Sequence, residues 1–341
     1  MLRQGSAGYE ELNVLVTGAD GFIGSHLVEG LARAGATVTA LSLYNSFDSH
    51  GWLDDIDASL REGIHAVRGD VRDASLMRGL VARQDIVFHL AALIAIPYSY
   101  AAPQSYVETN ILGTLNVLEA VRASHVTRVV HTSTSEVYGT ALVCPISETH
   151  RLQGQSPYSA SKIGADMMAE AYARSFDLPV AILRPFNTFG PRQSERAVIA
   201  SVLRQALDPN VSSIKVGDLS TIRDFTFVAD TVAAFLAIGI GQRIEYGTPY
   251  NAGSGHAVTI GEVAALALEA TGSHKPIESE SQRMRPEQSE VRELLADASR
   301  FSAATGWRPR TSLREGLVRT ADWWRSRLER GRVRRERDYV T

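Results

Sequence analysis

The chain has 341 residues, a net charge of −3 and 44% hydrophobic residues. This length suggests one large domain or two closely packed lobes, and the weak charge gives no reason to expect nucleic acid or a membrane surface as a partner. The single cysteine, Cys144, excludes an internal disulfide and suits a reducing cytoplasm, where we expect the protein to work. No apolar run reaches the ~20 residues that span a bilayer.

A glycine-rich turn near the N-terminus joins an expected strand at 13–17 to an expected helix at 25–34. Glycines let the backbone approach a phosphate, and a helix N-terminus supplies N–H groups and a positive dipole end. No Gly-Lys-Ser/Thr follows, so a P-loop is excluded. The turn favours a dinucleotide site over a simple packing turn. Its expected cofactor contacts are Gly18, Gly21, Phe22, Ile23 and Gly24.

The strand expected at 36–43 lacks the acid that usually holds the ribose 2′-hydroxyl of NAD. Ser42, Tyr44 and Asn45 stand at its end, and no arginine stands there for a 2′-phosphate. Ser42 and Asn45 remain the candidates for ribose contact. The sequence therefore favours NAD without excluding NADP.

Strands and helices continue to alternate, with strands expected at 66–71, 86–92 and 126–132 and a helix at 103–124. This order predicts an α/β fold, a doubly wound parallel sheet with helices on both faces. His89 lies within an apolar strand, so we expect a packed, hydrogen-bonded histidine. Further cofactor candidates lie at the ends of the third and fourth strands: Asp70, Val71, Leu90, Ala91 and Ala92.

Polar residues follow the fifth strand in the stretch 132–139, TSTSEVYG. Parallel sheets bind ligands at the carboxyl ends of their strands. Thr134 is suited to hydrogen-bond a substrate hydroxyl, and Glu136 is a candidate acid or base. Ordinary turn residues and a solvated acid are the alternative interpretation.

Tyr158 and Lys162 lie four residues apart in a predicted helix and so share one face. A nearby ammonium stabilises a phenolate, so we expect Lys162 to lower the pKa of Tyr158 from its free value of about 10. Such a phenol could take a proton from a sugar hydroxyl near neutral pH. Considered alone, this spacing is weak evidence, because an exposed pair of side chains one turn apart is the commoner explanation.

In order and spacing, these motifs together resemble the extended short-chain dehydrogenase/reductase family of nucleotide-sugar epimerases, dehydratases and decarboxylases. The resemblance extends from about Asn13 to Trp324. It implies that residues 1–183 form a Rossmann-type NAD-binding core that includes the catalytic helix. A smaller C-terminal α/β lobe at 184–341 would bind the nucleotide sugar and return some segments to the core. Thr134, Tyr158 and Lys162 would be the catalytic residues, with Tyr158 and Lys162 also at the cofactor.

Within this family the chain is most similar to 4,6-dehydratases of the legionaminic acid pathway type, which also lack the acid after the second strand. The similar stretches are 43–53, 132–141, 152–162, 184–192 and 223–230. The resemblance implies that Tyr158 deprotonates the C4 hydroxyl while C4 passes hydride to NAD. Glu136 then takes the C5 proton, water leaves from C6, and hydride returns to C6.

Ser135 departs from the pattern, because many 4,6-dehydratases have aspartate there as the acid for the leaving hydroxyl. The pair Ser135-Glu136 also resembles UDP-glucuronate decarboxylases, which are the first alternative; a 4-epimerase is the second. A non-catalytic dinucleotide-binding protein is a different class. Retention of Thr134, Tyr158 and Lys162 argues against it.

The C-terminal half contributes candidates for the substrate. An arginine fork offers two donors to a phosphate, although each arginine could instead lie on the surface. The resemblance assigns four residues to the nucleotide sugar: Asn187, Arg192, Arg223 and Arg285. No metal is expected.

Two apolar stripes at helical spacing occur in the helices from 103 and from 158. Core packing is the default interpretation, and the resemblance implies that these helices form a homodimer. The stripes are Val107, Ile111, Leu115 and Leu118, and Met167, Met168 and Tyr172.

Overall fold

A seven-stranded parallel sheet forms the centre of the larger half of the computed structural model, which describes residues 8–284 and 286–333. All its neighbouring strands pair in parallel, in the order β10-β6-β5-β4-β1-β2-β3. The order reverses between β1 and β4, which is where such sheets bind ligands. The predicted doubly wound sheet is confirmed. Its strands are β1 (Asn13–Thr17), β2 (Thr37–Leu43), β3 (Ile64–Gly69), β4 (Ile86–His89), β5 (Arg128–Thr132), β6 (Val180–Pro185) and β10 (Pro249–Ala252).

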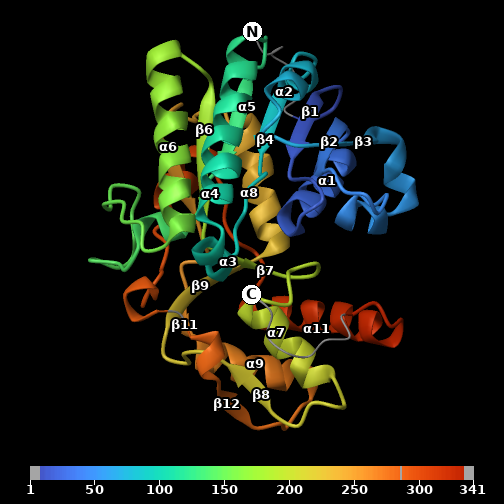
Figure 1. Cartoon of the computed structure of the whole chain (residues 1–341), viewed down its shortest axis with the longest axis vertical. Helices are drawn as coiled ribbons and strands as arrows, with labels where there is room; N and C mark the ends of the chain where they lie inside the picture. The colour runs from blue at the N-terminus through green and yellow to red at the C-terminus, as the bar shows by residue number, and fades with distance from the viewer. Residues whose placement is uncertain (1–7, 285, 334–341) are drawn as a thin grey trace.

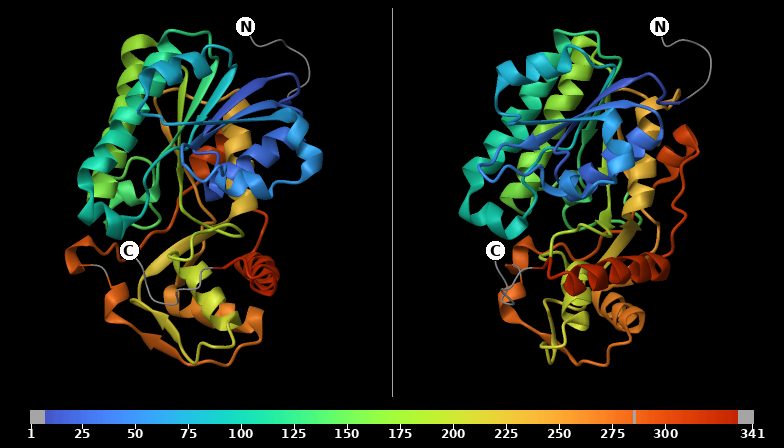
Figure 2. Two further views of the ribbon diagram at one scale, coloured as in Figure 1. Left: turned by 45° about the vertical axis from the view of Figure 1, so that its right-hand side comes forward. Right: turned by 90° about the vertical axis from the view of Figure 1, so that its right-hand side faces the viewer.

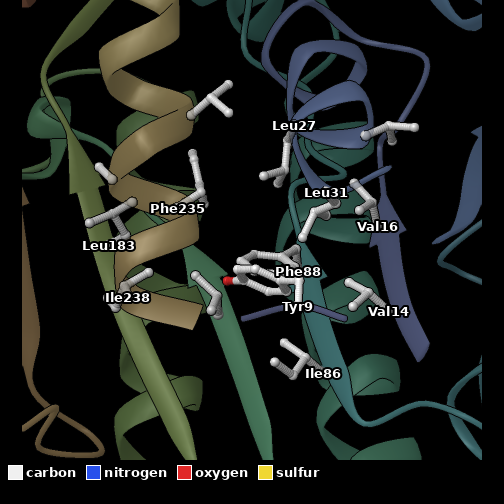
Figure 3. Close-up of a cluster of buried hydrophobic side chains, with 14 of the residues drawn as sticks. Tyr9, Val14, Val16, Leu27, Leu31, Ile86, Phe88, Leu183, Phe235 and Ile238 are labelled. Carbon is white, nitrogen blue, oxygen red and sulfur yellow. The ribbon is translucent and has the colours of Figure 1, made fainter. Parts of the chain in front are cut away.

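Helices cover both faces of this sheet (Figure 2). Alternate residues of a strand point to opposite faces, so Phe88 of β4 lies in the core against α1 and α8, whereas Val87 lies in the core against α2 and α5. Figure 3 shows Leu27 and Leu31 of α1 and Phe235 of α8 around Phe88. The helices of this half are α1 (Phe22–Arg33), α2 (Ala74–Val81), α3 (Ile96–Ala101), α5 (Gly113–Arg122), α6 (Pro157–Phe176), α8 (Val228–Ile240) and α10 (Ser299–Thr305).

The helix expected at 103–124 is present, but it contains a π-helical segment at Val107–Leu112 between α4 (Pro103–Tyr106) and α5. Asn110 lies in this segment. Its side chain accepts a hydrogen bond from Leu93 N and donates to Leu93 O and to Ser161 Oγ. A widened turn at a functional site is a common use of π geometry. Asn110 therefore ties this helix to the loop after β4 and to α6.

A smaller lobe lies below the sheet in Figure 1 and has its own apolar core. It contains a three-stranded sheet, β11-β9-β7, and a two-stranded sheet, β12-β8. Between β9 and β11 the chain returns to the larger half to form α8 and β10. The lobe's elements are β7 (Asn187–Phe189), β8 (Ile214–Val216), β9 (Ile222–Phe227), β11 (Ala257–Thr259), β12 (Ile277–Ser279), α7 (Val198–Leu207), α9 (Ile260–Thr271) and α11 (Leu313–Glu329).

Short 3-10 turns complete the described chain, at 51–55, 58–63, 135–138, 281–283 and 287–289. Within residues 8–284 and 286–333, no helix is both long enough and apolar enough to cross a membrane.

Candidate active site

The glycine turn lies between β1 and α1, and its last residue before the helix, Gly21, is the N-cap of α1. Gly18 has φ +67°, and a Cβ on it would come within 2.7 Å of the Ala91 nitrogen. A Cβ on Gly24 would overlap the Gly18 carbonyl oxygen. Glycine is required at both positions, so the turn packs tightly against the end of β4. This cradle fits a dinucleotide pyrophosphate, which the first N–H groups of α1 could bind.

A buried hydrogen-bond chain fixes the ends of β1 and β4. The Thr17 hydroxyl accepts hydrogen bonds from Leu90 N and Ala91 N and lies 2.8 Å from His89 Nδ1. Nε2 of His89 lies 3.0 Å from the hydroxyl of Thr114, which donates to Asn110 O. Burial keeps the pKa of His89 well below its usual value. The expectation of a packed, hydrogen-bonded histidine is confirmed.

Thr134 and Tyr158 are brought together at the carboxyl end of β5. Thr134 caps the 3-10 turn 135–138 by accepting from Glu136 N, at 3.2 Å. A Ser156–Ser159 capping box and Pro157 begin α6, which places Tyr158 in its first turn. The Thr134 hydroxyl lies close enough to the Tyr158 phenol to lower its pKa. The two residues can therefore hold one substrate hydroxyl between them.

Lys162 follows one turn later on α6, and its ammonium donates to Thr132 O at 2.6 Å. Burial lowers the pKa of Lys162 to about 8. The expected lowering of the Tyr158 pKa is wrong: burial raises that pKa, and the nearby Thr134 hydroxyl only partly offsets the rise. Desolvation penalises the phenolate, while the ammonium of Lys162 is directed at the β5 carbonyl.

Glu136 is half-buried in the turn, and its charge is close enough to raise the pKa of Tyr158 further. Its neighbour Ser135 is buried. The carboxylate of Glu136 and the phenol of Tyr158 give this site two groups that can accept protons at different positions.

Beneath these residues lies a buried charged cluster that the sequence analysis missed. One oxygen of Asp166 accepts from Ser133 Oγ at 2.7 Å and from Arg184 Nη2 at 2.9 Å, and the other lies 3.1 Å from His131 Nε2. Burial would raise the pKa of Asp166, but the bond to His131 and the charges of Arg184 and Lys162 hold it at about 2. The cluster anchors the end of β5 to α6 and β6. The four-residue spacing from Lys162 to Asp166 was its only local signal.

The substrate candidates of the C-terminal half have different surroundings. Asn187 Nδ2 lies 3.4 Å from Asp224 O, and Arg223 pairs with Glu290 at 2.9 Å. Arg192 is ion-paired with Glu29 of α1, which ties its loop to the larger half. Arg285 lies outside the described residues.

Several candidates for the adenosine end of the cofactor are engaged within the protein. Ser42 is buried and donates to Val67 O at 3.2 Å. Asn45 bonds Leu43 and Ser49 within its own loop. The carboxylate of Asp70 holds the Arg72 guanidinium, which lowers the pKa of Asp70. Strands β3 and β4 end at Gly69 and His89, earlier than predicted, so Val71, Leu90, Ala91 and Ala92 lie in the loops that follow these strands.

A family model described as GDP-mannose 4,6 dehydratase matches residues 15–320, a range that includes the glycine turn, Thr134, Tyr158 and Lys162. The chain belongs to this family. It is thus an enzyme of the extended short-chain dehydrogenase/reductase group of nucleotide-sugar dehydratases and epimerases, as its motifs implied.

Relatives in this family carry both activities. A dTDP-glucose 4,6-dehydratase of Actinoplanes sp. is 33% identical, over 92% of this chain and 98% of that protein. A UDP-glucose 4-epimerase of Mycolicibacterium smegmatis is 32% identical, over 93% of this chain and 100% of its own. The solved structure of DesIV, a dTDP-glucose 4,6-dehydratase from Streptomyces venezuelae with NAD bound, has a TM-score of 0.84 and 30% identity, covering 92% and 97% of the two chains.

Proposed function

We propose that this enzyme is an NAD-dependent nucleotide-sugar 4,6-dehydratase. The observation that carries the proposal is the position of Glu136, a half-buried carboxylate near the Tyr158 phenol. A 4-epimerase needs a base only for the C4 hydroxyl, which Tyr158 supplies. A dehydratase needs a second base for C5, and Glu136 is suited to that task.

The protein residues act at successive carbons of the sugar. Tyr158 takes the proton of the C4 hydroxyl, which the Thr134 hydroxyl orients. Once C4 is a ketone, the C5 proton is acidic, and Glu136 removes it as the C6 hydroxyl departs. Ser135 is a poor acid, so the proton that leaves with this hydroxyl has to come from Glu136 or from water.

The cofactor in this proposal is NAD, which also occurs in the structure of the related DesIV. When bound, NAD supplies the hydride acceptor for C4 and the hydride donor for C6, and its charged ring favours the phenolate. Lys162, with a pKa of about 8, is mostly protonated at neutral pH and would hold the nicotinamide ribose. The cradle at Gly18 and Gly24 would hold the pyrophosphate.

The substrate in this proposal is a nucleoside-diphosphate sugar. Arg223 and Asn187 in the smaller lobe, with Arg285, are proposed to bind its diphosphate or sugar. Arg192 and Arg223 are each ion-paired within the protein, with Glu29 and with Glu290, so either arginine would have to share its guanidinium between that carboxylate and the diphosphate. The assignment of residues 1–183 to the cofactor and mainly 184–341 to the substrate is part of the same proposal.

One observation favours a second candidate. Serine at position 135 is suited to a UDP-glucuronate decarboxylase, because loss of carbon dioxide after C4 oxidation needs no acid at C6. The side chain is buried, which also limits its use as a proton donor.

Product mass distinguishes these activities. We would incubate the enzyme with UDP-GlcNAc, GDP-GlcNAc, dTDP-glucose and UDP-glucuronate. The proposal predicts the loss of one water from a hexose substrate. Loss of carbon dioxide from UDP-glucuronate would establish the decarboxylase instead. An unchanged mass with a new retention time would mean epimerisation, and no change in any substrate would favour a non-catalytic dinucleotide-binding protein.

Replacing Glu136 by Gln tests the assigned base. We expect product formation to fall about 10²- to 10³-fold, because the amide cannot accept the C5 proton. Oxidation at C4 should continue, so absorbance at 340 nm should build up in a single turnover. Glu148→Gln is the matched control. It makes the same change at a carboxylate that accepts a hydrogen bond from Asn251 N and has no assigned part in the reaction. Retained dehydration by Glu136→Gln would contradict the assignment.

We also propose that the enzyme is a cytoplasmic homodimer. Val107 and Met167, one from each predicted stripe, are about half exposed, at 52% and 42%, whereas Leu118 is buried in the core. The exposed apolar side chains of these adjacent helices could pair with a second copy. Light scattering should give twice the chain mass of 37.1 kDa, and a monomer mass would contradict the dimer.

A further inference from the structure

The end of β2 carries no acid, yet the structure brings one there from another segment. Asp20 belongs to the glycine turn, between Gly18 and Gly21. Its Oδ2 accepts a hydrogen bond from Leu43 N, the last residue of β2, at 3.3 Å. The carboxylate therefore lies between the pyrophosphate turn and the end of the second strand. In a Rossmann fold this is where the adenosine ribose lies.

The residues at the usual position are not suited to replace the missing acid. Ser42 is 1% exposed, donates to Val67 O and lies 3.0 Å from His50 Nδ1. The Asn45 side chain closes its own loop, since its amide donates to Ser49 O and its oxygen accepts from Phe47 N. Both side chains thus form their hydrogen bonds within the protein.

Asp20 retains acceptor capacity. Its hydrogen bonds come from backbone N–H groups, its own and that of Leu43, and a carboxylate can accept about four. Among the described residues no arginine or lysine forms an ion pair with Asp20, and the charge that acts on its carboxylate is that of His50. The side chain is half-buried, so a ligand hydroxyl could reach it.

The surrounding loop favours the same arrangement. Trp52 N donates to Asp20 O at 3.2 Å, so the segment after β2 folds back onto the glycine turn. Arg68 lies on β3 next to Ser42 of β2 in the strand register. Its guanidinium forms an ion pair with Asp48 at 2.6 Å. Arg68, the arginine beside the end of β2, is thus already paired with an acid of the following loop.

We propose that Asp20 replaces the missing acid of β2: its carboxylate accepts a hydrogen bond from the adenosine 2′-hydroxyl of NAD and repels the 2′-phosphate of NADP. A 2′-phosphate would put negative charge against this carboxylate and remove the hydroxyl donor. Asp20 is therefore the residue that selects NAD. This inference rests on the proposed use of NAD by the enzyme.

Calorimetric titration of the full chain with NAD, NADP and 2′-deoxy-NAD tests the inference without relying on turnover. For the unmodified protein we expect NAD to bind about tenfold or more tightly than the other two, as for one charge-assisted hydrogen bond. If 2′-deoxy-NAD bound as tightly as NAD, the inference would be overturned without any mutation.

The matched variants are Asp20→Asn and Asp57→Asn, which remove the same charge. Asp57 is an exposed acid that caps the following 3-10 turn. In Asp20→Asn the affinity for NAD should fall about tenfold, and the preference over NADP and over 2′-deoxy-NAD should shrink below about threefold. Asp57→Asn should behave like the unmodified protein.

The outcomes separate the two proposals. If Asp20→Asn folds, as judged by its melting temperature, and keeps the full preference for NAD, then Asp20 is not the selecting residue although NAD remains the cofactor. If the unmodified protein binds neither NAD nor NADP, the proposed function fails as well.

Discussion

The two halves of the molecule treat their polar residues differently. In the larger half, Asp166, Arg184 and His131 form a fully buried charged cluster beneath Thr134 and Lys162. In the smaller lobe, Asp224 accepts hydrogen bonds from Ser254 N, Gly255 N and Ala296 N and so fixes loops from separate parts of the chain. The larger half thus places a buried ion pair beneath its reacting groups, whereas the lobe uses a buried carboxylate bonded to backbone N–H groups to hold its loops together.

Because of this difference, we expect substitutions in the two halves to have different effects. Changes beneath the reacting groups should lower turnover or stability, because the buried groups have no water to replace a lost partner. Changes in the lobe should mainly weaken substrate binding.

Tyr158→Phe should lower kcat about 10³- to 10⁴-fold, because it removes the proton acceptor for the C4 hydroxyl. The ring would keep its edge contact with Tyr106, so the melting temperature should stay close to that of the unmodified enzyme. Product mass and a thermal melt measure both quantities. Full activity in this variant would remove Tyr158 from the mechanism.

Asp166→Asn should destabilise the fold by about 3–5 kcal/mol, because it leaves the Arg184 charge buried without its partner. Urea unfolding measures the change. Glu170→Gln is the control on the same helix: it removes a pair with the exposed Arg174, which should cost less than about 1 kcal/mol. Equal effects of the two variants would contradict the distinction between buried cluster and surface.

Low pH should lower the unfolding free energy of the protein, because it protonates Asp166. Its pKa of about 2 lies below the ordinary 3.8, so the carboxylate stabilises the fold above pH 3.8 and this contribution is lost as the pH falls through 2. The difference in unfolding free energy between the unmodified protein and Asp166→Asn should therefore shrink by about 2 kcal/mol from pH 5 to pH 2. Urea unfolding across this range measures it, and a constant difference would argue against an ionised, stabilised Asp166.

Arg223→Lys should raise KM about tenfold and change kcat by less than about threefold, because lysine keeps the charge but loses the two-donor fork. Steady-state kinetics with the substrate found in the mass assay would measure the split. Arg314→Lys is the control in the same lobe, where the arginine pairs with the exposed Glu269. A fall in kcat alone would place Arg223 with the reacting groups instead.

The sequence predicted those features that depend on local patterns. Strand β1, the glycine turn and α1 follow from apolar periodicity and glycine spacing, although α1 begins at Phe22, before the expected residue 25. The juxtaposition of Thr134 with Tyr158 came from the resemblance to a family.

Features that depend on distant segments were not predicted. Asp166 meets Arg184 only because α6 packs on β6, and Arg192 meets Glu29 across the two halves. The pKa of Tyr158 depends on burial, which outweighs the lysine one turn away. Spacing along a helix gives the direction of a side chain but not the dielectric surroundings of its end.

The central claim is that the hydrogen removed from C4 ends at C6 while Glu136 serves C5. Its most direct test is a nucleotide hexose deuterated at C4, chosen by the mass assay. We expect a product that has lost water and carries the deuterium at C6, located by NMR. Deuterium that returned to C4 in a product would contradict the dehydratase and favour the epimerase or the decarboxylase.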